Sequence, residues 1–154
     1  MGAHRLPNVG CMKLPESTHR LFESTHHATV VTVNPDGSPQ ASLVWVQRDG
    51  DEILIGMEGA RPKARNLRRD PRVTLLIEDH ENDEVRGLRQ YLLLHGTAVV
   101  TGPDIPGEFD ALMDAQARRY LGLPRYPFEN RSSTTAVIVR ITPTRITGNG
   151  PWAS

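Results

Sequence analysis

The residues most able to do chemistry in this sequence lie in one short basic run. Residues 61–72 contain six basic residues among twelve positions. Pro62 suits the first turn of a helix, and Asp70-Pro71 ends that helix from outside. The N–H groups of a first turn are free and carry the positive end of the helix dipole. Lys63 beside them would therefore complete a site for an anion, most naturally a phosphate.

The arginines of the same run have a simpler interpretation. At about 100° per residue, Ala64 and Leu67 share the face that packs against the protein, and the arginines spread over the opposite face. These outward residues are Arg61, Arg65, Arg68 and Arg69, while Lys63 and Asn66 flank the apolar stripe. A solvated helix face explains most outward arginines, so Lys63 is the stronger binding candidate.

Two expected strand segments carry the second candidate feature. They are Ser42-Leu43-Val44-Trp45 and Ile55-Gly56-Met57-Glu58-Gly59, whose ends converge on the basic helix. Glycines allow a ligand to approach the backbone closely, and a flat ring could lie along the strand edges. Turn chemistry and core packing explain these residues equally well on their own. The anion site downstream favours a ligand that carries both a phosphate and a ring.

Other catalytic arrangements find little support. The six histidines, including His26-His27, lack metal-ligand spacing and cysteine partners, so we expect no metal site. Gly37-Ser38-Pro39 lacks the second glycine of a hydrolase nucleophile elbow. The acidic cluster 79–84 has the composition of a solvated loop, and no nucleotide-binding glycine pattern occurs. The residues alone identify no catalytic group.

The elements that must position these residues are mostly strands. Alternating and β-branched runs predict strands over 28–33, 40–47, 52–57, 72–78, 88–101 and 134–147. The first three would form an antiparallel meander. Gly96 marks a bulge, and Pro143 favours a sheet edge or a strand end. Six antiparallel strands predict a mainly β (α+β) barrel.

Helices are expected to be few and short. The pattern indicates one over 15–24, one between 59 and 71, and one over 105–121. The 154 residues suit one domain, over 14–154, and 13 glycines with 12 prolines argue against a helical bundle. Residues 1–13 show no periodicity and are expected to form a flexible tail.

Charge and cysteine content narrow the function classes. Eighteen basic and eighteen acidic residues balance, so no general attraction to nucleic acid or to an anionic membrane is expected. Cys11 stands alone, and no apolar stretch is long enough to span a bilayer. These features indicate a soluble cytoplasmic protein.

The order of the motifs resembles a known family, the split β-barrel proteins related to pyridoxamine 5'-phosphate oxidase. The resemblance rests on Ala28-Thr29-Val30 before residues 34–40, on the Lys-x-x-Asn-Leu-x-x-Asp-Pro-Arg run from Lys63, and on His95-Gly96-Thr97-Ala98. The sequence is most similar to the branch of small reductases that use a deazaflavin, coenzyme F420. The resemblance implies an FMN-binding split-barrel fold and a homodimer with two cofactor clefts at its interface.

The resemblance also implies a set of cofactor-binding residues. In this sequence they are Ser42, Leu43, Val44, Trp45, Met57, Gly59, Arg61, Pro62, Lys63, Asn66, Tyr91 and Trp152. Arg61 and Lys63 would contact the cofactor phosphate, and Asn66 would hold the loop. The segment 42–45 would run beside the ring with 56–59 beneath it. Tyr91 and Trp152 would close the cleft from the neighbouring subunit.

Three cofactors occur among the relatives: FMN, deazaflavin and, in some branches, haem. The Arg-x-x-Leu-Leu-Lys phosphate motif of the FMN oxidases is missing here. The arginines near Lys63 would suit the anionic tail of the deazaflavin by charge-assisted pairing. Of the 18 basic residues only Lys13 and Lys63 are lysines, which suggests a GC-rich source and also favours the deazaflavin over FMN.

The function implied is hydride transfer from reduced deazaflavin to a small organic acceptor. The cofactor supplies the hydride, so the protein needs only to position the acceptor over it. An FMN-binding oxidoreductase of the same family is the first alternative. A carrier or sensor that holds the cofactor without turning it over is the second.

Overall fold

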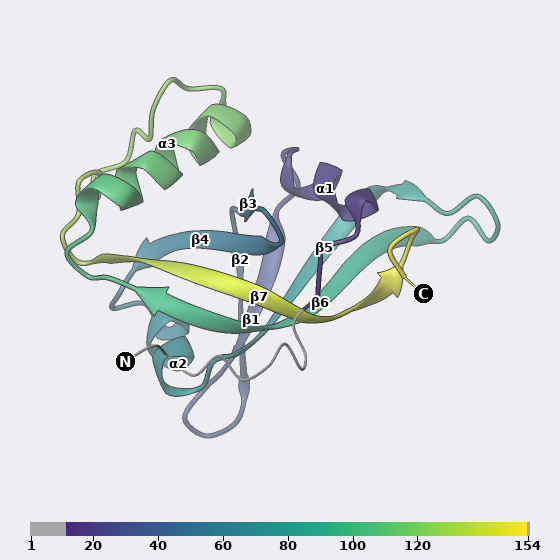
Figure 1. Ribbon diagram of the computed structural model, residues 1–154, viewed down its shortest axis with the longest axis horizontal. Helices are drawn as coiled ribbons and strands as arrows, with labels where there is room; N and C mark the ends of the chain where they lie inside the picture. Colours follow the sequence, from purple (N-terminus) through teal and green to yellow (C-terminus); the bar gives the residue numbers. More distant parts are fainter. Residues whose placement is uncertain (1–11, 154) are drawn as a thin grey trace.

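The computed structural model describes residues 12–153, which fold around one antiparallel sheet of seven strands (Figure 1). The strands are β1 (Ala28–Val33), β2 (Pro39–Val44), β3 (Gln47–Asp49), β4 (Glu52–Glu58), β5 (Arg72–Asn82), β6 (Arg89–Thr101) and β7 (Ala136–Asn149). Their order in the sheet is β2-β1-β5-β6-β7-β4-β3. The mainly β class is therefore confirmed. Most of the expected tail, residues 1–11, lies outside the described part.

Three helices accompany the sheet in the described residues. They are α1 (Glu16–Phe22), α2 (Pro62–Arg69) and α3 (Pro106–Leu121), which agree with the predicted segments. Figure 1 shows α3 standing over one end of β4 and β7, with α2 near the opposite side of the sheet. None of the helices in residues 12–153 has the length and apolar character that a membrane crossing needs.

The strand count differs from the predicted six because the expected strand over 40–47 is broken in two. Residues 39–44 pair with β1, whereas Gln47–Asp49 pairs with β4. The predicted three-strand meander is therefore wrong, because β2 and β4 lie far apart in the sheet order. The backbone carries the chain between the two sheet edges through Trp45 and Val46. No ladder joins β2 to β3 in the described chain, so hydrogen bonds do not close the sheet into a barrel.

The break occurs where α3 satisfies the backbone in place of a strand. The N–H of Val46 donates to the hydroxyl of Tyr120 at 3.1 Å, and the carbonyl of Val46 accepts a hydrogen bond from Arg119. Buried backbone groups must find partners, and here two side chains of the same helix supply them. The position of α3 thus decides where β2 ends.

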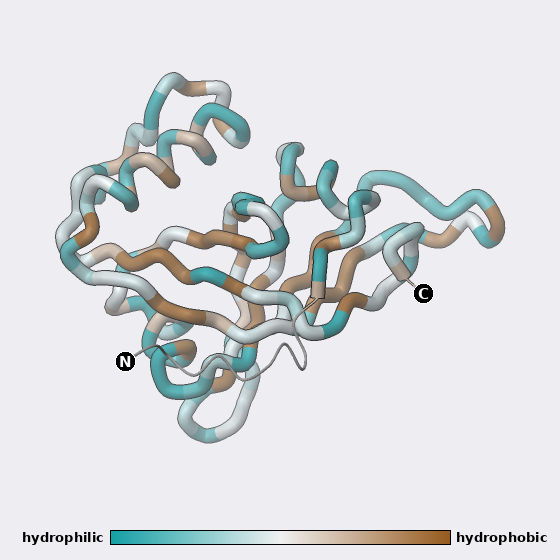
Figure 2. The backbone as a smooth tube through the Cα atoms, viewed as in Figure 1, coloured by the Kyte–Doolittle hydropathy of each residue, from teal (hydrophilic) through white to brown (hydrophobic). Residues whose placement is uncertain are grey.

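The core lies on the inward face of the sheet. Burial alternates along the strands, as in β4, where Ile53, Ile55 and Met57 are buried and their neighbours are less so. Figure 2 shows the hydrophobic residues recurring along the strands. Ala64 and Leu67 of α2 also join this core, as the helical pattern predicts.

One further strand prediction needs correction, and the one for Pro143 is confirmed as a local sheet edge. β5 continues through the acidic cluster to Asn82, and the side chain of Asp79 is only 1% exposed, so this segment begins as a strand and not as a solvated loop. Pro143 lies inside β7, beyond the last pair with β4 at Ile53↔Ile141. It therefore sits where β7 has a strand partner on one side only, and its carbonyl accepts from the N–H of Met12 at 3.1 Å.

The bulge predicted at Gly96 is confirmed. The register between β6 and β7 shifts between His95 and Gly96. A Cβ atom at Gly96 would lie 2.7 Å from the carbonyl oxygen of Thr142, closer than such atoms can approach. Glycine is required there because the two backbones come close together.

Candidate functional site

A pocket of about 280 Å³ lies between the strand end of β2 and helix α3. One wall consists of His27, Leu43, Val44, Trp45, Gly56 and Lys63. The opposite wall consists of Met113 and Gln116 on α3 and of Tyr126 and Phe128 in the segment that follows it. The pocket is therefore mostly apolar and aromatic, with a cation on one side and an amide on the other.

Lys63 is the cation of this pocket. Its side chain is half-buried, and its Nζ donates a hydrogen bond to Oγ of Ser42 at 3.3 Å. Burial, with a smaller contribution from the charge of Arg61, lowers the pKa of Lys63. In residues 12–153 no carboxylate lies within ion-pair distance of its ammonium group. A lysine in this state is suited to receive an anion.

The start of α2 places Lys63 at the pocket. Arg61 has extended backbone before the helix, Pro62 occupies its first turn, and no side chain caps its N-terminal N–H groups. Asn66 is buried, and its amide donates to Oγ1 of Thr32 at 3.0 Å and to Oδ1 of Asn34 at 2.9 Å. These bonds fix α2 against β1 and the turn that follows it.

The aromatic wall is held by a chain of hydrogen bonds. The hydroxyl of Tyr126 donates to Oδ1 of Asn130 at 2.6 Å, and the amide of Asn130 donates to Glu58 at the end of β4 at 3.1 Å. The backbone N–H of Tyr126 donates to Asp114 of α3 at 2.8 Å, and Arg131 pairs with the same carboxylate. The segment after α3 is thus attached to both the helix and the sheet.

The C-terminal end of α3 is attached to the opposite wall. The guanidinium of Arg119 donates to the carbonyl of Ser24 at 2.6 Å, and the hydroxyl of Tyr120 donates to the carbonyl of His26 at 2.7 Å. The ring of Tyr120 stacks on Trp45 with centroids 5.1 Å apart. These contacts orient the indole of Trp45 at the pocket.

The glycines of β4 have a structural use. A Cβ atom at Gly56 would lie 2.6 Å from Sδ of Met113, and one at Gly59 would lie 3.0 Å from the carbonyl of Thr135. Gly56 borders the pocket, but the space next to it is filled by α3. The close approach expected of a ligand is made by the protein itself.

The structure brings together some of the sequence-predicted residues and separates others. Leu43, Val44, Trp45 and Lys63 line the pocket, Ser42 contacts Lys63, and Arg61 and Pro62 begin the adjoining helix. Met57 is buried in the core, and Gly59 and Asn66 contact other parts of the chain. These three do not line the pocket of the single chain.

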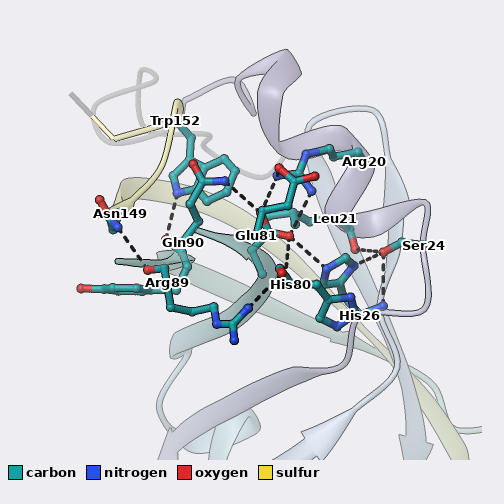
Figure 3. A network of polar contacts seen from close by, with 12 residues as sticks. Arg20, Leu21, Ser24, His26, His80, Glu81, Arg89, Gln90, Asn149 and Trp152 are labelled. Atoms are coloured by element: carbon teal, nitrogen blue, oxygen red, sulfur yellow. Dashed lines mark hydrogen bonds and ion pairs between the residues drawn. The ribbon is translucent and has the colours of Figure 1, made fainter. Parts of the chain in front are cut away.

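Tyr91 and Trp152 lie next to each other near the C-terminus. Nε1 of Trp152 donates to the carbonyl of Tyr91 at 3.0 Å, and Trp152 is only 5% exposed, beneath the guanidinium of Arg20 (Figure 3). Neither residue lines the pocket of the same chain. Trp152 is also part of the core, so its first role in this structure is packing.

A second polar cluster is centred on Asp79, and Figure 3 shows its partners Arg20, His26 and Gln90. Its carboxylate accepts hydrogen bonds from Arg20 at 3.0 and 2.5 Å and from Gln90 at 3.2 Å, and it lies 3.1 Å from Nε2 of His26. Burial alone would raise the pKa of Asp79, but the hydrogen bonds from Arg20 and from the backbone N–H of His80 lower it to about 2. The cluster joins the segment around α1 to β5 and β6, so its role is structural.

Sequence reasoning missed the α3 wall of the pocket. Gln116 is the clearest omission, because it is a polar residue on a helix stripe that otherwise reads Phe109, Met113 and Ala117. A polar residue on an apolar stripe was the available signal. His27, Tyr126 and Phe128 gave no comparable signal, since their position depends on contacts between distant segments.

The site holds no cluster of metal ligands. Within the described range 12–153, no group of three or more histidine, cysteine, aspartate or glutamate side chains is arranged to hold a metal ion. The chemistry available at the pocket is therefore an anion contact at Lys63, an apolar and aromatic surface, and the amide of Gln116.

Solved structures of several proteins are similar to this chain. An F420 reductase is 28% identical, with a TM-score of 0.66, and the match covers 86% of this chain and 98% of that chain. A conserved hypothetical protein from Mycobacterium tuberculosis is 24% identical, with a TM-score of 0.67, over 90% of this chain and 86% of that one. The haem storage protein from Vibrio cholerae is 19% identical, with a TM-score of 0.64, and the match covers 90% of this chain and 96% of that chain. The last two share the fold alone.

The family model for pyridoxamine 5'-phosphate oxidase matches residues 14–150, nearly the whole described chain. This match agrees with the motif order, with the antiparallel sheet, and with the similarity to the F420 reductase. The chain belongs to the pyridoxamine 5'-phosphate oxidase family.

Proposed function

We propose that this protein is an oxidoreductase that binds a phosphorylated deazaflavin, coenzyme F420, and passes a hydride from its reduced form to a small organic acceptor. The observation that carries the proposal is Lys63, a half-buried cation without a carboxylate partner in residues 12–153, at the edge of an aromatic pocket. An anionic group would meet the ammonium while a ring lay beside Leu43 and Trp45. The 28% identity to an F420 reductase supports the choice of cofactor.

The residues present fit such a ligand on two counts. The ammonium of Lys63 and the uncapped start of α2 together offer positive charge and free N–H groups to a phosphate. Leu43 and Trp45 offer apolar surface to a ring. When bound, the reduced deazaflavin supplies the hydride, and the residues of this chain hold and shield the two reactants.

A second copy of the chain is part of the proposal. Cross-strand pairing places Leu43, Thr29, Leu76 and Leu93 side by side on the outward face of β2, β1, β5 and β6. Leu43 is 69% exposed and Leu76 is 37% exposed, and Leu43 also lines the pocket. We propose that a homodimer covers this row and completes the two cofactor clefts, because an exposed apolar face of this kind is typical of an interface.

The proposal is tested by mixing the purified protein, without oxygen, with reduced deazaflavin and a panel of quinones and enones. We expect the absorbance of oxidised deazaflavin to appear faster with the protein than without it. Binding without acceleration across the panel would favour a carrier or sensor. Binding of FMN in preference to deazaflavin would favour the FMN-binding oxidoreductase. Binding of neither cofactor would overturn the proposed site.

A further inference from the structure

Gln116 is a buried residue whose amide nitrogen has no hydrogen-bond partner within residues 12–153. Its side chain is 1% exposed, and no group in residues 12–153 accepts a hydrogen bond from its Nε2. The residue lies on α3 and lines the same pocket as Lys63. An unpaired buried amide destabilises a protein, so its presence needs a reason.

Single nitrogens of the part-exposed His19 and Arg48 are also buried without a partner in residues 12–153, but the other buried polar side chains all have partners. They are Thr18, His26, Thr32, Asn66, Asp79 and Gln90, and each makes at least one side-chain hydrogen bond. Gln116 differs from them because its Nε2 has no hydrogen-bond partner within residues 12–153 and because it lines a pocket. A leucine or methionine would fill the same place on the apolar stripe of α3 without leaving a polar group unpaired.

The surroundings of Gln116 define the ligand that would satisfy it. Trp45, Met113, Tyr126 and Phe128 give the pocket apolar and aromatic surface, which suits a planar ring. The unpaired atom of the amide is a donor, so its partner is an acceptor, and the apolar and aromatic surface around it favours an acceptor without charge. A carbonyl oxygen carried by the ring has this chemistry.

We infer that Gln116 donates a hydrogen bond from its amide nitrogen to a carbonyl oxygen on a planar ligand, and so selects rings that carry a carbonyl. The inference rests on the proposed function for the use of this pocket, and where the carbonyl belongs to the acceptor it adds the substrate class: ring ketones, enones and quinones. The carbonyl can belong to the acceptor or to the cofactor ring, since both are planar groups for the same pocket. The experiment separates these sources.

The test compares two small probes that differ in one carbonyl group, 1-tetralone and tetralin, on the unliganded protein by equilibrium dialysis. Gln116→Leu removes the amide and keeps the apolar volume, and Gln116→Met is the matched second variant. We expect both substitutions to lower the ratio of tetralone affinity to tetralin affinity about tenfold, the effect of one lost hydrogen bond in a buried site. Because the ratio is compared between proteins, the different hydrophobicity of the two probes cancels.

A parallel titration with deazaflavin and with FMN locates the carbonyl. A changed tetralone ratio with unchanged cofactor affinity assigns the bond to the acceptor, and a loss of cofactor affinity of about tenfold assigns it to the cofactor ring. The inference is overturned if the tetralone ratio and both cofactor affinities stay within twofold of the parent protein. If the parent binds neither cofactor while the tetralone ratio still depends on Gln116, the proposed function fails and this inference stands.

The melting temperatures of the unliganded variants distinguish this role from a purely structural one. A structural role predicts a lower melting temperature in the variants, whereas the inference predicts an equal or higher one. The melting temperature of Gln116→Leu should equal or exceed that of the parent, because an unpaired buried amide is removed. A fall of several degrees in both the Leu and the Met variant would show that the amide is bonded inside the free protein, and it would contradict the inference.

Discussion

Lys63 is half-buried and lines an aromatic pocket, so its charge can reach a ligand there, whereas the arginines around it do not line this pocket. Within residues 12–153 the ammonium of Lys63 hydrogen-bonds to the hydroxyl of Ser42 alone, whereas the guanidinium of Arg68 donates to the carbonyl of Gly102 at 2.9 Å on the surface. The two residues belong to the same helix and differ in what their charge can reach. This difference makes them a matched pair for a binding experiment.

Replacing Lys63 by alanine should weaken cofactor binding and leave the fold intact. Alanine is a better helix former than lysine, so α2 should persist. A charge-assisted contact contributes roughly 1.5 to 3 kcal/mol, so the affinity for deazaflavin should fall about ten- to a hundredfold. Fluorescence titration of the parent and of the variant with deazaflavin and with FMN measures the effect.

Arg68→Ala is the control for that substitution. Its charge is exposed and bonded to a backbone carbonyl, so the cofactor affinity should change by less than about threefold. A Lys63→Ala protein that binds both cofactors as tightly as the parent would show that the anion contact lies elsewhere.

The Asp79 cluster predicts that the protein loses stability in mild acid. Burial, together with the nearby His80, lowers the pKa of His26 below its ordinary value of 6.5 despite the opposing charge of Asp79. His26 therefore binds a proton at a higher pH in the unfolded chain than in the folded chain. The free energy of unfolding consequently falls as the pH drops below about 6.5. The pKa of Asp79, lowered to about 2, adds a further loss as the pH falls below 3.8.

Urea unfolding at several pH values between 7.5 and 5 measures this dependence. His26→Gln should flatten the decrease in stability over that interval, because the titrating ring is gone. His27→Gln is the matched substitution, because it removes a neighbouring histidine whose side chain is exposed. Equal slopes for the parent and for His26→Gln would contradict the assignment to His26.

At the residue scale the sequence correctly placed Lys63 in the first turn of a helix and misjudged Asp79. Lys63 could be identified because its surroundings are local: a proline at the first turn and a helix whose apolar face is set by its own spacing. Asp79 owes its burial to Arg20, which is 59 positions earlier in the chain. No local sequence pattern indicates the pairing of Arg20 with Asp79. The composition of the acidic run 79–84 therefore predicts a loop, although the run begins within a strand.

At the scale of elements, the docking of α3 decides the shape of the site. Its predicted range of 105–121 agrees with the observed Pro106–Leu121, because a proline at the start and an apolar stripe are local signals. Its position was not predictable, since it depends on contacts from Arg119 and Tyr120 to residues 24–26 and 46–47. The same contacts explain why the predicted strand over 40–47 breaks.

Gly56 is the point at which α3 approaches β4, so a side chain there should disturb the site. In Gly56→Ala the new Cβ would lie 2.6 Å from Sδ of Met113 and 3.1 Å from the ring of Phe109, so these side chains or the helix that carries them would have to shift. Overpacking of this kind destabilises a protein by about 1 to 3 kcal/mol. Urea unfolding measures the loss.

The matched control is Gly107, which lies on α3 itself. Gly107→Ala places a Cβ atom in open space on the first turn of α3, so its effect on unfolding should be neutral or stabilising by up to about 1 kcal/mol. If Gly56→Ala were as stable as the parent and the pocket kept its affinity for cofactor, α3 would not be in the described contact with β4.

At the scale of the whole molecule, one chain exposes both an apolar sheet face and one side of its pocket. Leu43 takes part in both, which couples the assembly of two chains to the completion of the site. The alternation within each strand could be predicted from the sequence. The row across four strands could not, because it requires the sheet order β2-β1-β5-β6, in which sequence neighbours are separated.

Leu76 tests the dimer without touching the pocket of its own chain. Light scattering of the parent protein should give about twice the 17.1 kDa of one chain. Leu76→Glu places a charge in the middle of the apolar row, and burying an unpaired charge is strongly unfavourable, so the dimer should dissociate at micromolar concentration. Cofactor affinity should then fall at least about tenfold, because each cleft loses the wall supplied by the partner.

Val99→Glu is the matched substitution for that experiment. Val99 is 62% exposed and lies on β6 beyond its last pair with β5, Arg72↔Thr97, so a charge there leaves the row intact. This variant should keep both the mass of the dimer and the affinity for cofactor. Since both glutamates add the same charge to an exposed strand position, a difference between them reports the location of the interface. A monomeric parent that binds cofactor tightly, or a Leu76→Glu protein that stays dimeric, would rule out a shared cleft on this face.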